Sequence, residues 1–233
     1  MRMYSQILMG CAAALALFGC GGTGNGIINV PNPRVRVANV MPGIASAKAK
    51  VGDDTISSNI AFGAVSDYTV TGNGNKDLAV GDSTFNNLAT LPNQLFETQR
   101  RYTGIAYGSS PRTIVLLDED KSAGPSNAVA LQIVDATQST PNVDVYLSAP
   151  LDPLPASPAF TNVAAGSISD FSEYGMSGSS TSVRVRVFPT GTTVTPIIDV
   201  PIAFEEKTRH AIVIYSDSGQ TTGFNVLTLK ENV

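Results

Sequence analysis

The sequence predicts an all-β protein made of two tandem Ig-like β-sandwich domains. Short segments that alternate apolar and polar residues recur along the chain, and turn-forming residues separate them. Charged residues make up only 15% of the 233 residues, which is low for helical surfaces, while Gly and Pro number 21 and 14. Two blocks of similar sequence also follow one another, each about the size of a domain.

The first 19 residues have the parts of a cleaved secretory signal. Arg2 supplies a positive start, and residues 7–18 form an apolar run that is too short to span a bilayer, which takes about 20 residues. The segment Leu17-Phe18-Gly19-Cys20 then resembles the lipobox of bacterial lipoproteins, although a smaller residue is usual at the position of Phe18. The resemblance implies cleavage before Cys20, a thioether-linked diacylglycerol on Cys20 and an acylated new N-terminus.

Lipidation of Cys20 would make the membrane the first partner of this chain, because two or more acyl chains anchor a protein stably. In lipoproteins an Asp after the lipidated cysteine often retains the protein in the inner membrane, so Gly21 favours the outer membrane. We therefore expect a lipid-anchored protein of the bacterial cell envelope that faces the periplasm or the surface. A plain secretory signal with an unmodified cysteine is the alternative. The Gly-rich residues 20–32 are interpreted as a flexible tether.

Behind the tether we expect a first sandwich over residues 33–120, a linker over 121–126 and a second sandwich over 127–233. Alternating or continuously apolar segments predict strands at 35–37, 113–117, 143–147, 183–187 and 211–215. Turn signals lie between them at 72–75, 109–111, 141–142 and 217–219. The continuously apolar segment 211–215 is expected to be a central, buried strand.

The two sandwiches are expected to be homologous and separately cored, because three blocks recur in the same order. Residues 59–68 and 162–171 share the pattern Asn, aliphatic, Ala, any, Gly, any, aliphatic, Ser, Asp, aromatic. The other matching pairs are 35–39 with 131–135, Phe96-Glu97 with Phe204-Glu205, and 101–107 with 209–215. The spacing between matching blocks grows along the chain, as expected if loops carry the insertions.

These blocks also resemble the family known as domain of unknown function 4397. The resemblance rests on the alternating strand and turn Arg34-Val35-Arg36-Val37-Ala38-Asn39-Val40-Met41-Pro42-Gly43, on Val143-Asp144-Val145-Tyr146, and on Ile60-Ala61-Phe62-Gly63 with Ser66-Asp67-Tyr68. It covers nearly all of residues 34–233 in two copies, although Ala165 replaces the Phe in the second copy. The resemblance implies a β-domain that occurs in bacterial envelope proteins, often in tandem, and no assigned catalytic residues.

Packing explains the repeated block better than binding does. Gly63 is expected in a turn with positive φ, the Ser66-Asp67 side chains are expected to cap that turn, and Tyr68 is expected at a core or sheet-edge position. Gly166, Ser169-Asp170 and Phe171 are the equivalents in the second copy.

The sequence predicts no catalytic, cofactor-binding or metal-binding residues. His210 is the only histidine and begins an apolar strand, which favours a structural role. The segment Gly175-Met176-Ser177-Gly178-Ser179 lacks the spacing and context of a nucleophile elbow. One histidine and no cysteine beyond Cys11 and Cys20 cannot supply the usual zinc ligands. Asp53-Asp54 and Asp118-Glu119-Asp120 do not match an EF-hand loop and are interpreted as solvated turns.

The formal net charge of −4 argues against a nucleic-acid binder, which needs a basic face. We expect a non-catalytic binding or structural role in the envelope, with a polysaccharide or a protein as partner, although the absence of Trp argues against strong sugar stacking. The alternatives are an envelope hydrolase or other enzyme with an unrecognised site, and a spacer. An ordered cleft between the domains would favour binding, and smooth domains with an open linker would favour the spacer.

Overall fold

The computed structural model is all-β, as predicted, and describes residues 31–119, 122–138 and 141–231. These residues form 17 strands in four sheets. The expected signal over 1–19, the lipidated Cys20 and the tether up to residue 30 lie outside the described residues. Within them, no helix has the length and apolar character needed to cross a membrane.

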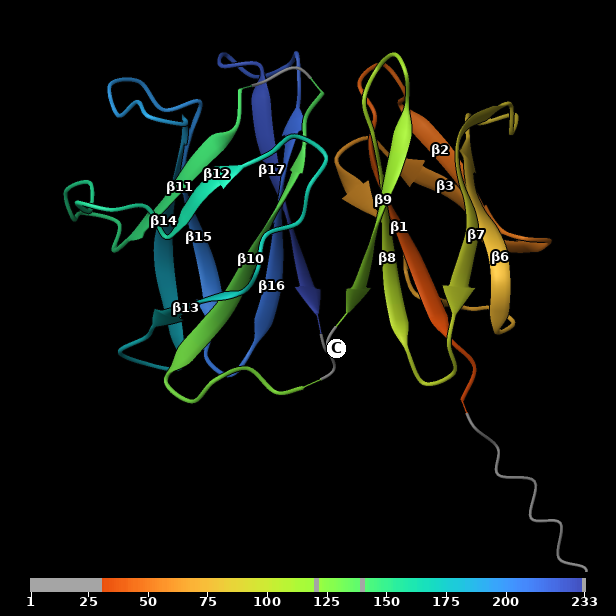
Figure 1. Ribbon diagram of the computed structural model, residues 1–233, viewed down its shortest axis with the longest axis horizontal. Coiled ribbons are helices and arrows are strands. Elements are labelled where there is room, and N and C mark those ends of the chain that lie inside the picture. The colour runs from red at the N-terminus through yellow and green to blue at the C-terminus, as the bar shows by residue number, and fades with distance from the viewer. Residues whose placement is uncertain (1–30, 120–121, 139–140, 232–233) are drawn as a thin grey trace, which may run out of the picture.

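The first sandwich packs a five-stranded sheet against a four-stranded one (Figure 1). The five-stranded sheet has the order β4-β1-β8-β9, and β5 also pairs with β1. Its strands are β1 (Arg34–Val40), β4 (Ala64–Val65), β5 (Thr69–Val70), β8 (Arg101–Tyr107) and β9 (Thr113–Glu119). The other sheet has the order β3-β2-β6-β7. Its strands are β2 (Ser46–Val51), β3 (Asp54–Ala61), β6 (Gly74–Gly81) and β7 (Asn87–Phe96).

The second sandwich repeats this plan with two four-stranded sheets, ordered β13-β10-β16-β17 and β12-β11-β14-β15. The strands of the first sheet are β10 (Ala128–Ala136), β13 (Ser172–Gly175), β16 (Arg209–Ser216) and β17 (Phe224–Glu231). Those of the second are β11 (Val143–Ser148), β12 (Phe160–Val163), β14 (Ser180–Pro189) and β15 (Ile198–Glu205). The predicted linker 121–126 falls between the end of β9 and the start of β10.

The two copies agree in register as well as in strand order. β1 pairs in parallel with β8, and β10 in parallel with β16, while every other described strand pair is antiparallel. Val35 faces Tyr102 in the first copy, and Leu131 faces His210 in the second. These are the positions that the sequence blocks match, so the duplication extends to individual residue pairs.

Each sandwich has its own core of alternating inward-facing side chains. Phe96 anchors the first core and Phe204 the second, and both are fully buried. Each ring meets an aromatic partner edge to face: Phe96 packs on Tyr102 with centroids 5.1 Å apart, and Phe204 packs on His210 with centroids 5.0 Å apart. Large aromatic side chains contribute strongly to core energetics, so this conserved arrangement marks equivalent anchor points.

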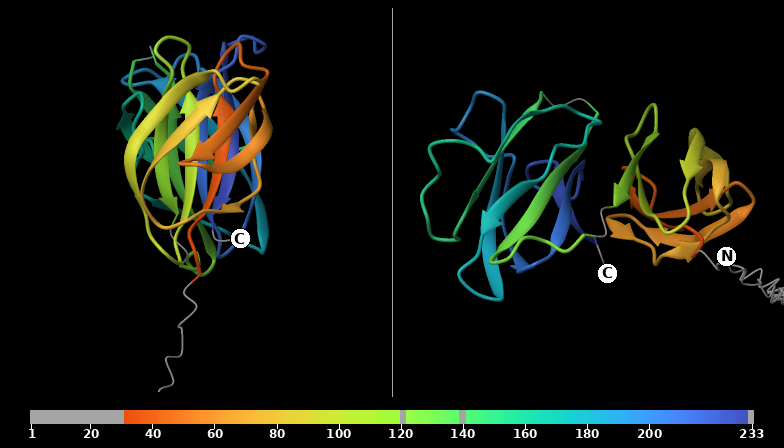
Figure 2. Two further views of the ribbon diagram at one scale, coloured as in Figure 1. Left: turned by 90° about the vertical axis from the view of Figure 1, so that its right-hand side faces the viewer. Right: turned by 60° about the horizontal axis from the view of Figure 1, so that its bottom comes forward.

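A third core joins the sandwiches, in addition to the core that each sandwich has of its own. It lies where the outer face of the β1–β8 sheet meets the outer face of the β10–β16 sheet (Figures 1 and 2). Val40 and Ile105 enter it from the first copy, and Val134 and Val213 enter it from the second. The physical reason is the continuous apolar run in these strands, since a strand that is apolar on both faces needs a covering layer on each side.

The contacts at this interface come in pairs related by an approximate two-fold. The hydroxyl of Tyr107 lies against Gly166, and the hydroxyl of Tyr215, at the equivalent position, lies against Gly63. Both glycines have positive φ, at 77° and 73°, as their predicted turns require. The same surface of each copy therefore meets its counterpart, as at the interface of a symmetric dimer.

The connector between the copies is packed against the second sandwich. The amide of Gly124 donates to the carbonyl of Lys207 at 3.0 Å, in the turn between β15 and β16. A Cβ at Gly124 would lie 2.4 Å from the carbonyl oxygen of Thr208, so only glycine fits this close approach. The connector is thus not an open linker of the kind that would favour a spacer.

Candidate ligand-binding groove

His210 is a packing residue in the structure. Its ring is only 7% exposed and meets Phe204, and its Nε2 lies 3.0 Å from the Thr208 hydroxyl. Burial and the nearby Lys230 ammonium lower its pKa from 6.5 to about 4, so the ring is neutral at physiological pH. The equivalent Tyr102 occupies the same place in the first copy, which supports the structural role predicted for this position.

The acidic pairs serve the fold, and the interpretation of Asp118-Glu119 as a solvated turn is wrong, because both residues lie in β9 and Glu119 is only 1% exposed. The Asp54 carboxylate accepts hydrogen bonds from the Thr71 hydroxyl, the Gly72 amide and the Lys76 ammonium at 2.6, 3.1 and 3.0 Å, which lower its pKa. Asp118 forms an ion pair of 3.1 Å with Arg100. Over the described part of the chain, no group of three or more His, Cys, Asp or Glu side chains is placed to hold a metal.

The repeated serines bind the neighbouring strand instead of capping the glycine turn as expected. The Ser66 hydroxyl accepts from the Val37 amide at 3.0 Å, and the Ser169 hydroxyl accepts from the Ile133 amide at 2.8 Å. Each bond fastens the segment after the turn to the first strand of its own sandwich, β1 or β10. Ser177, in the segment that was not expected to form a nucleophile elbow, lies in an exposed bend after β13.

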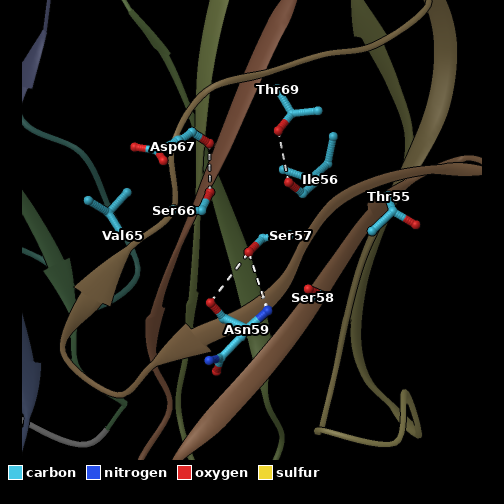
Figure 3. Close-up of a pocket in the computed structure, with 9 residues that line it drawn as sticks. All are labelled: Thr55, Ile56, Ser57, Ser58, Asn59, Val65, Ser66, Asp67 and Thr69. Carbon is cyan, nitrogen blue, oxygen red and sulfur yellow. Dashed lines mark hydrogen bonds between the residues drawn. The ribbon is translucent and has the colours of Figure 1, made fainter.

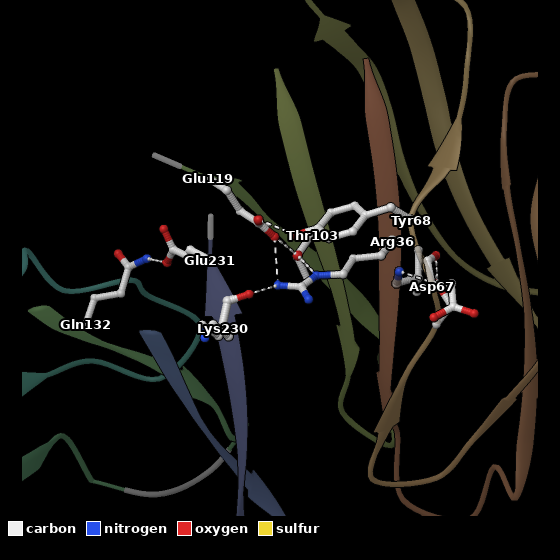
Figure 4. A network of polar contacts seen from close by, with 10 residues as sticks. Arg36, Asp67, Tyr68, Thr103, Glu119, Gln132, Lys230 and Glu231 are labelled. Atoms are coloured by element: carbon white, nitrogen blue, oxygen red, sulfur yellow. Dashed lines mark hydrogen bonds and ion pairs between the residues drawn. The ribbon is translucent and has the colours of Figure 1, made fainter. Parts of the chain in front are cut away.

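Glu119 is the centre of a buried polar network at the junction of the two copies (Figure 4). The Arg36 guanidinium pairs with Glu119 at 3.0 Å and donates to the Thr103 hydroxyl at 2.7 Å. The hydroxyls of Tyr68 and Thr103 also donate to Glu119, and burial together with this carboxylate raises the pKa of Tyr68. Arg36 further donates to the Lys230 carbonyl at 2.9 Å, which ties the first copy to the second.

The second copy replaces this network with fewer polar groups. Gln132 stands where the first copy has Arg36, and it donates to Glu231, the equivalent of Glu119. Phe171 replaces Tyr68 and packs under Arg209 at 4.2 Å. The charge of Glu119 is neutralised by Arg36 and its oxygens are occupied by hydroxyl donors, so the network is a structural element and not a reactive pair.

One hollow of the first sandwich lies along β3. It measures about 530 Å³ and opens between β3 and the segment that carries β4 and β5 (Figure 3). Its lining is mostly hydroxyl and amide groups: Thr55, Ser57, Ser58, Asn59, Ser66 and Thr69, with Ile56, Val65 and the carboxylate of Asp67. Such groups both donate and accept hydrogen bonds, so they complement a ligand that is itself rich in hydroxyls.

A second hollow of about 260 Å³ adjoins it on the outer face of the β2–β3 pair. Lys48, Lys50 and Phe85 line it together with Ala49, and it shares Thr55, Ser57 and Ser58 with the first hollow. The two hollows thus meet over β3 and form one groove, which we name the β3 groove. A groove with this continuity suits an extended ligand better than a compact one.

The second copy has no open counterpart of this face. In β11, which corresponds to β2, the outward side chains Asp144, Tyr146 and Ser148 are all buried. The long loop between β11 and β12 lies against this face, and Arg186 donates to its Asp152 and Pro153 carbonyls at 3.4 and 2.9 Å. The β2–β3 connection of the first copy is a short turn, which leaves its face open.

A third hollow, of about 320 Å³, lies between the two copies. Pro42, Gly43 and Phe62 line it from the first copy, and Asp217 and Ser218 line it from the second. Gln138 and Ser109 are the positions equivalent to Pro42 and Asp217, and there the Gln138 side chain accepts from the Ser109 amide at 2.8 Å. The two copies therefore leave a hollow at one pair of equivalent positions and make a polar contact at the other pair.

Sequence reasoning missed the groove residues Lys48, Lys50 and Phe85. The alternation of lysine with alanine over Ser46–Val51 is typical of any half-exposed strand. One signal was available, because Phe85 is an aromatic residue inside the otherwise polar turn Gly81-Asp82-Ser83-Thr84-Phe85-Asn86. Nothing local in the sequence says that this turn folds back over the lysines.

Comparison with known proteins bears on the family. Residues 33–146 match the family described as domain of unknown function (DUF4397). This part of the chain is similar to a DUF4397 domain. The match spans the first sandwich and continues through β10 into β11 of the second, and it confirms the resemblance predicted from the repeated blocks.

No curated protein matches this chain in sequence. A solved structure described as "Alpha-glucan binding by a streptococcal virulence factor" is 8% identical to it, and the match covers 78% of this chain and 92% of the other, with a TM-score of 0.28. A likeness at that level carries no argument about a ligand of this chain, so any ligand must be inferred from the groove itself.

Proposed function

We propose that this chain is a lipid-anchored, non-catalytic binding protein of the bacterial cell envelope, and that its β3 groove holds a polysaccharide. The observation that carries the proposal is the difference between the two copies. The same outer face is covered in the second sandwich and open in the first, where hydroxyl and amide side chains line two connected hollows. A ligand with many hydroxyl groups along an extended chain matches that lining.

The non-catalytic part of the proposal is supported by what the reactive side chains already do. His210 is buried against Phe204, and Glu119 is neutralised by Arg36. Neither group faces the β3 groove. The groove itself offers hydroxyls that hydrogen-bond to their neighbours, such as Thr69, which donates to the Ile56 carbonyl at 2.8 Å. Binding needs no more than this, because many weak polar contacts along a polymer add up through multivalency.

Ser58→Tyr tests the groove, since Ser58 is exposed and lines both hollows. The full chain, purified in detergent, is titrated with polysaccharides of defined composition by calorimetry. We expect the bulky ring to weaken binding by about tenfold, because it fills the junction of the hollows. The matched control is Thr161→Tyr, at the equivalent exposed position of β12, which should bind like the unaltered chain. Equal binding by all three proteins would show that the ligand does not use the groove.

Cys20→Ser tests the anchor. Loss of the acyl chains should move the protein from the membrane fraction to the soluble fraction after cell lysis, because no other acylated cysteine remains in the mature chain. The measurement is the distribution of the protein between the two fractions after ultracentrifugation, with Cys11→Ser as control, since Cys11 lies in the predicted signal. Continued membrane association of the Cys20→Ser protein would refute lipid anchoring.

A further inference from the structure

Lys48 and Lys50 form a positively charged corner at one end of the β3 groove. Both project from the outer face of β2. Their cross-strand partners carry no charge: Lys48 lies opposite Gly81, and Lys50 lies opposite Thr55 and Ala79. Over the described residues, no carboxylate lies within ion-pair distance of either ammonium group. The other described lysines differ, since Lys76, Lys207 and Lys230 each pair with a carboxylate.

Phe85 places the Lys50 ammonium. The Lys50 Nζ lies 4.5 Å from the centroid of the Phe85 ring, within the range of a cation–π contact. Phe85 has a φ of 64°, a backbone conformation that is strained for a bulky residue. A strained backbone persists only where the surrounding structure enforces it, so this turn is built to put the ring at this spot.

Asp82 enforces the turn that carries Phe85. Its carboxylate accepts hydrogen bonds from the Thr84 amide at 2.8 Å and from the Asn86 amide at 3.0 Å, and it also binds both of their side chains. These bonds lower the pKa of Asp82 and occupy its two oxygens. The two ends of the turn approach each other closely at Gly81, where a Cβ would lie 2.8 Å from the Asn86 carbonyl oxygen. Glycine is therefore needed at this position.

The chemistry of the corner follows from these contacts. An aromatic ring attracts an ammonium group without neutralising it, whereas a carboxylate would do both. Lys50 is therefore positioned and still carries its full charge, with the Lys48 charge two residues away on the same face. Two uncompensated positive charges beside a hydroxyl-lined groove, of which the Lys50 charge is held by Phe85, complement a polymer that has both hydroxyls and carboxylates.

The corner is a property of the first copy alone. The positions equivalent to Lys48 and Lys50 are Asp144 and Tyr146, which are buried in the second copy. Asp144 there accepts from the Asn162 amide at 2.8 Å and serves the fold. The sandwich fold thus has no structural requirement for two lysines at these places.

We propose that the Lys48–Lys50–Phe85 corner binds the carboxylates of an acidic polysaccharide, a polymer of uronic acids, while its hydroxyls lie along β3. This rests on the proposed function, because it names the chemical class of the polymer in the same groove. A nucleic acid is the less suited polyanion, because DNA has no free sugar hydroxyls to match the hydroxyl and amide groups that line the groove.

The test compares each polyuronate with its own neutral form. The full chain in detergent is titrated with polygalacturonate and alginate, with their methyl esters, with dextran and with single-stranded DNA. We expect the free acids to bind at least about tenfold more tightly than the esters, with an affinity that falls as salt rises. The double variant Lys48→Gln/Lys50→Gln should lose at least about fivefold in affinity for the acids and nothing for dextran.

Matched variants separate charge from folding. Lys207→Gln/Lys230→Gln removes the same net charge elsewhere and should leave polyuronate binding within about twofold of the unaltered chain. Phe85→Asn removes the ring but keeps a residue that tolerates positive φ. It should keep the thermal midpoint and still weaken polyuronate binding, because Lys50 loses its position.

Four outcomes would contradict the inference. The first is equal affinity for acids and esters, or polyuronate binding that the Lys48→Gln/Lys50→Gln change leaves unaffected. Binding of dextran alone that Ser58→Tyr removes would overturn it and leave the proposed function standing. DNA bound as tightly as polyuronate, with the same loss in the lysine variant, would make the corner a general anion site and overturn the glycan assignment. Binding of none of the polysaccharides would overturn both proposals.

Discussion

At the scale of single residues, the two copies fill one equivalent core position with different side chains. Tyr102 and His210 sit at equivalent places and meet equivalent phenylalanines edge to face. In the first copy the Tyr102 phenol oxygen accepts from the Glu97 amide at 3.0 Å, whereas in the second copy the His210 Nε2 lies 3.0 Å from the Thr208 hydroxyl. The histidine differs in that it titrates between neutral and acidic pH.

His210 should therefore make the fold sensitive to acid. Its pKa is about 4 in the folded protein and 6.5 ordinarily, so between these values the unfolded chain binds more protons than the folded one. The stability that the neutral ring supports is complete above about pH 6.5 and is lost as the pH falls towards 4. His210→Tyr should remove this part of the acid sensitivity, because tyrosine stays neutral over the whole range.

The measurement is the urea midpoint of both proteins at several pH values between about 7 and 4. The difference between them should move in favour of His210→Tyr as the pH falls. His210→Phe serves as a second variant that lacks both the charge and the hydroxyl. A constant difference across the range would mean that His210 titrates alike in both states.

At the scale of elements, the turn between β3 and β4 and its counterpart after β12 connect sequence, packing and symmetry. The pattern with Gly63 and Gly166 predicted positive φ at both places, and the structure has it. What the pattern could not contain is the partner, because the tyrosine that covers each glycine comes from the opposite copy. Local residue chemistry fixes a turn, whereas a contact across the molecule depends on how two sheets come together.

Gly166→Ala should destabilise the protein for two separable reasons. Alanine at a φ of 77° costs about 1 kcal/mol, and its Cβ would lie 2.7 Å from the Tyr107 hydroxyl oxygen. Tyr107→Phe removes that oxygen, so in its background the same Gly166→Ala change should cost less. A double-mutant cycle on free energies of unfolding should give a coupling of at least about 0.5 kcal/mol.

Gly63→Ala with Tyr215→Phe is the matched comparison. There the hydroxyl oxygen lies 3.0 Å from the added Cβ, so the coupling should have the same sign and a smaller size. Additive effects at both sites would show that the tyrosines move aside without cost, and that the paired contacts do not support the interface.

At the scale of the whole molecule, the sequence predicted the all-β class and the duplication but not the joining of the copies. The short alternating segments predicted the all-β class, and the two similar blocks predicted the duplication. The continuous apolar run Ala211–Tyr215 predicted a strand covered on both faces, but it does not show that the first sandwich covers its outer face. The β3 groove could not be predicted for a related reason, because it exists where one loop is short in the first copy and long in the second.

Val213→Asp should uncouple the two sandwiches. Val213 is fully buried in the third core. A carboxylate at this place would lie in apolar surroundings, which should cost about 2–5 kcal/mol of stability. Each sandwich keeps its own core, so urea unfolding should separate into two transitions. Small-angle scattering should show a larger radius of gyration before any urea is added.

Val194→Asp makes the same change at a valine that is 91% exposed and should leave both measurements unaltered. A single transition and an unchanged radius in the Val213→Asp protein would mean that the third core does not hold the copies together.

The third core also has a consequence for truncated forms of the protein. A fragment that stops after β9 would present the bare β1–β8 face, with Val40 and Ile105 turned to water. Because that face normally meets a near copy of itself, two such fragments would dock through it and form a dimer in place of the tandem pair. Crystals of such a half-molecule would then contain a two-fold dimer whose interface takes the place of the contact between the two sandwiches of the intact protein.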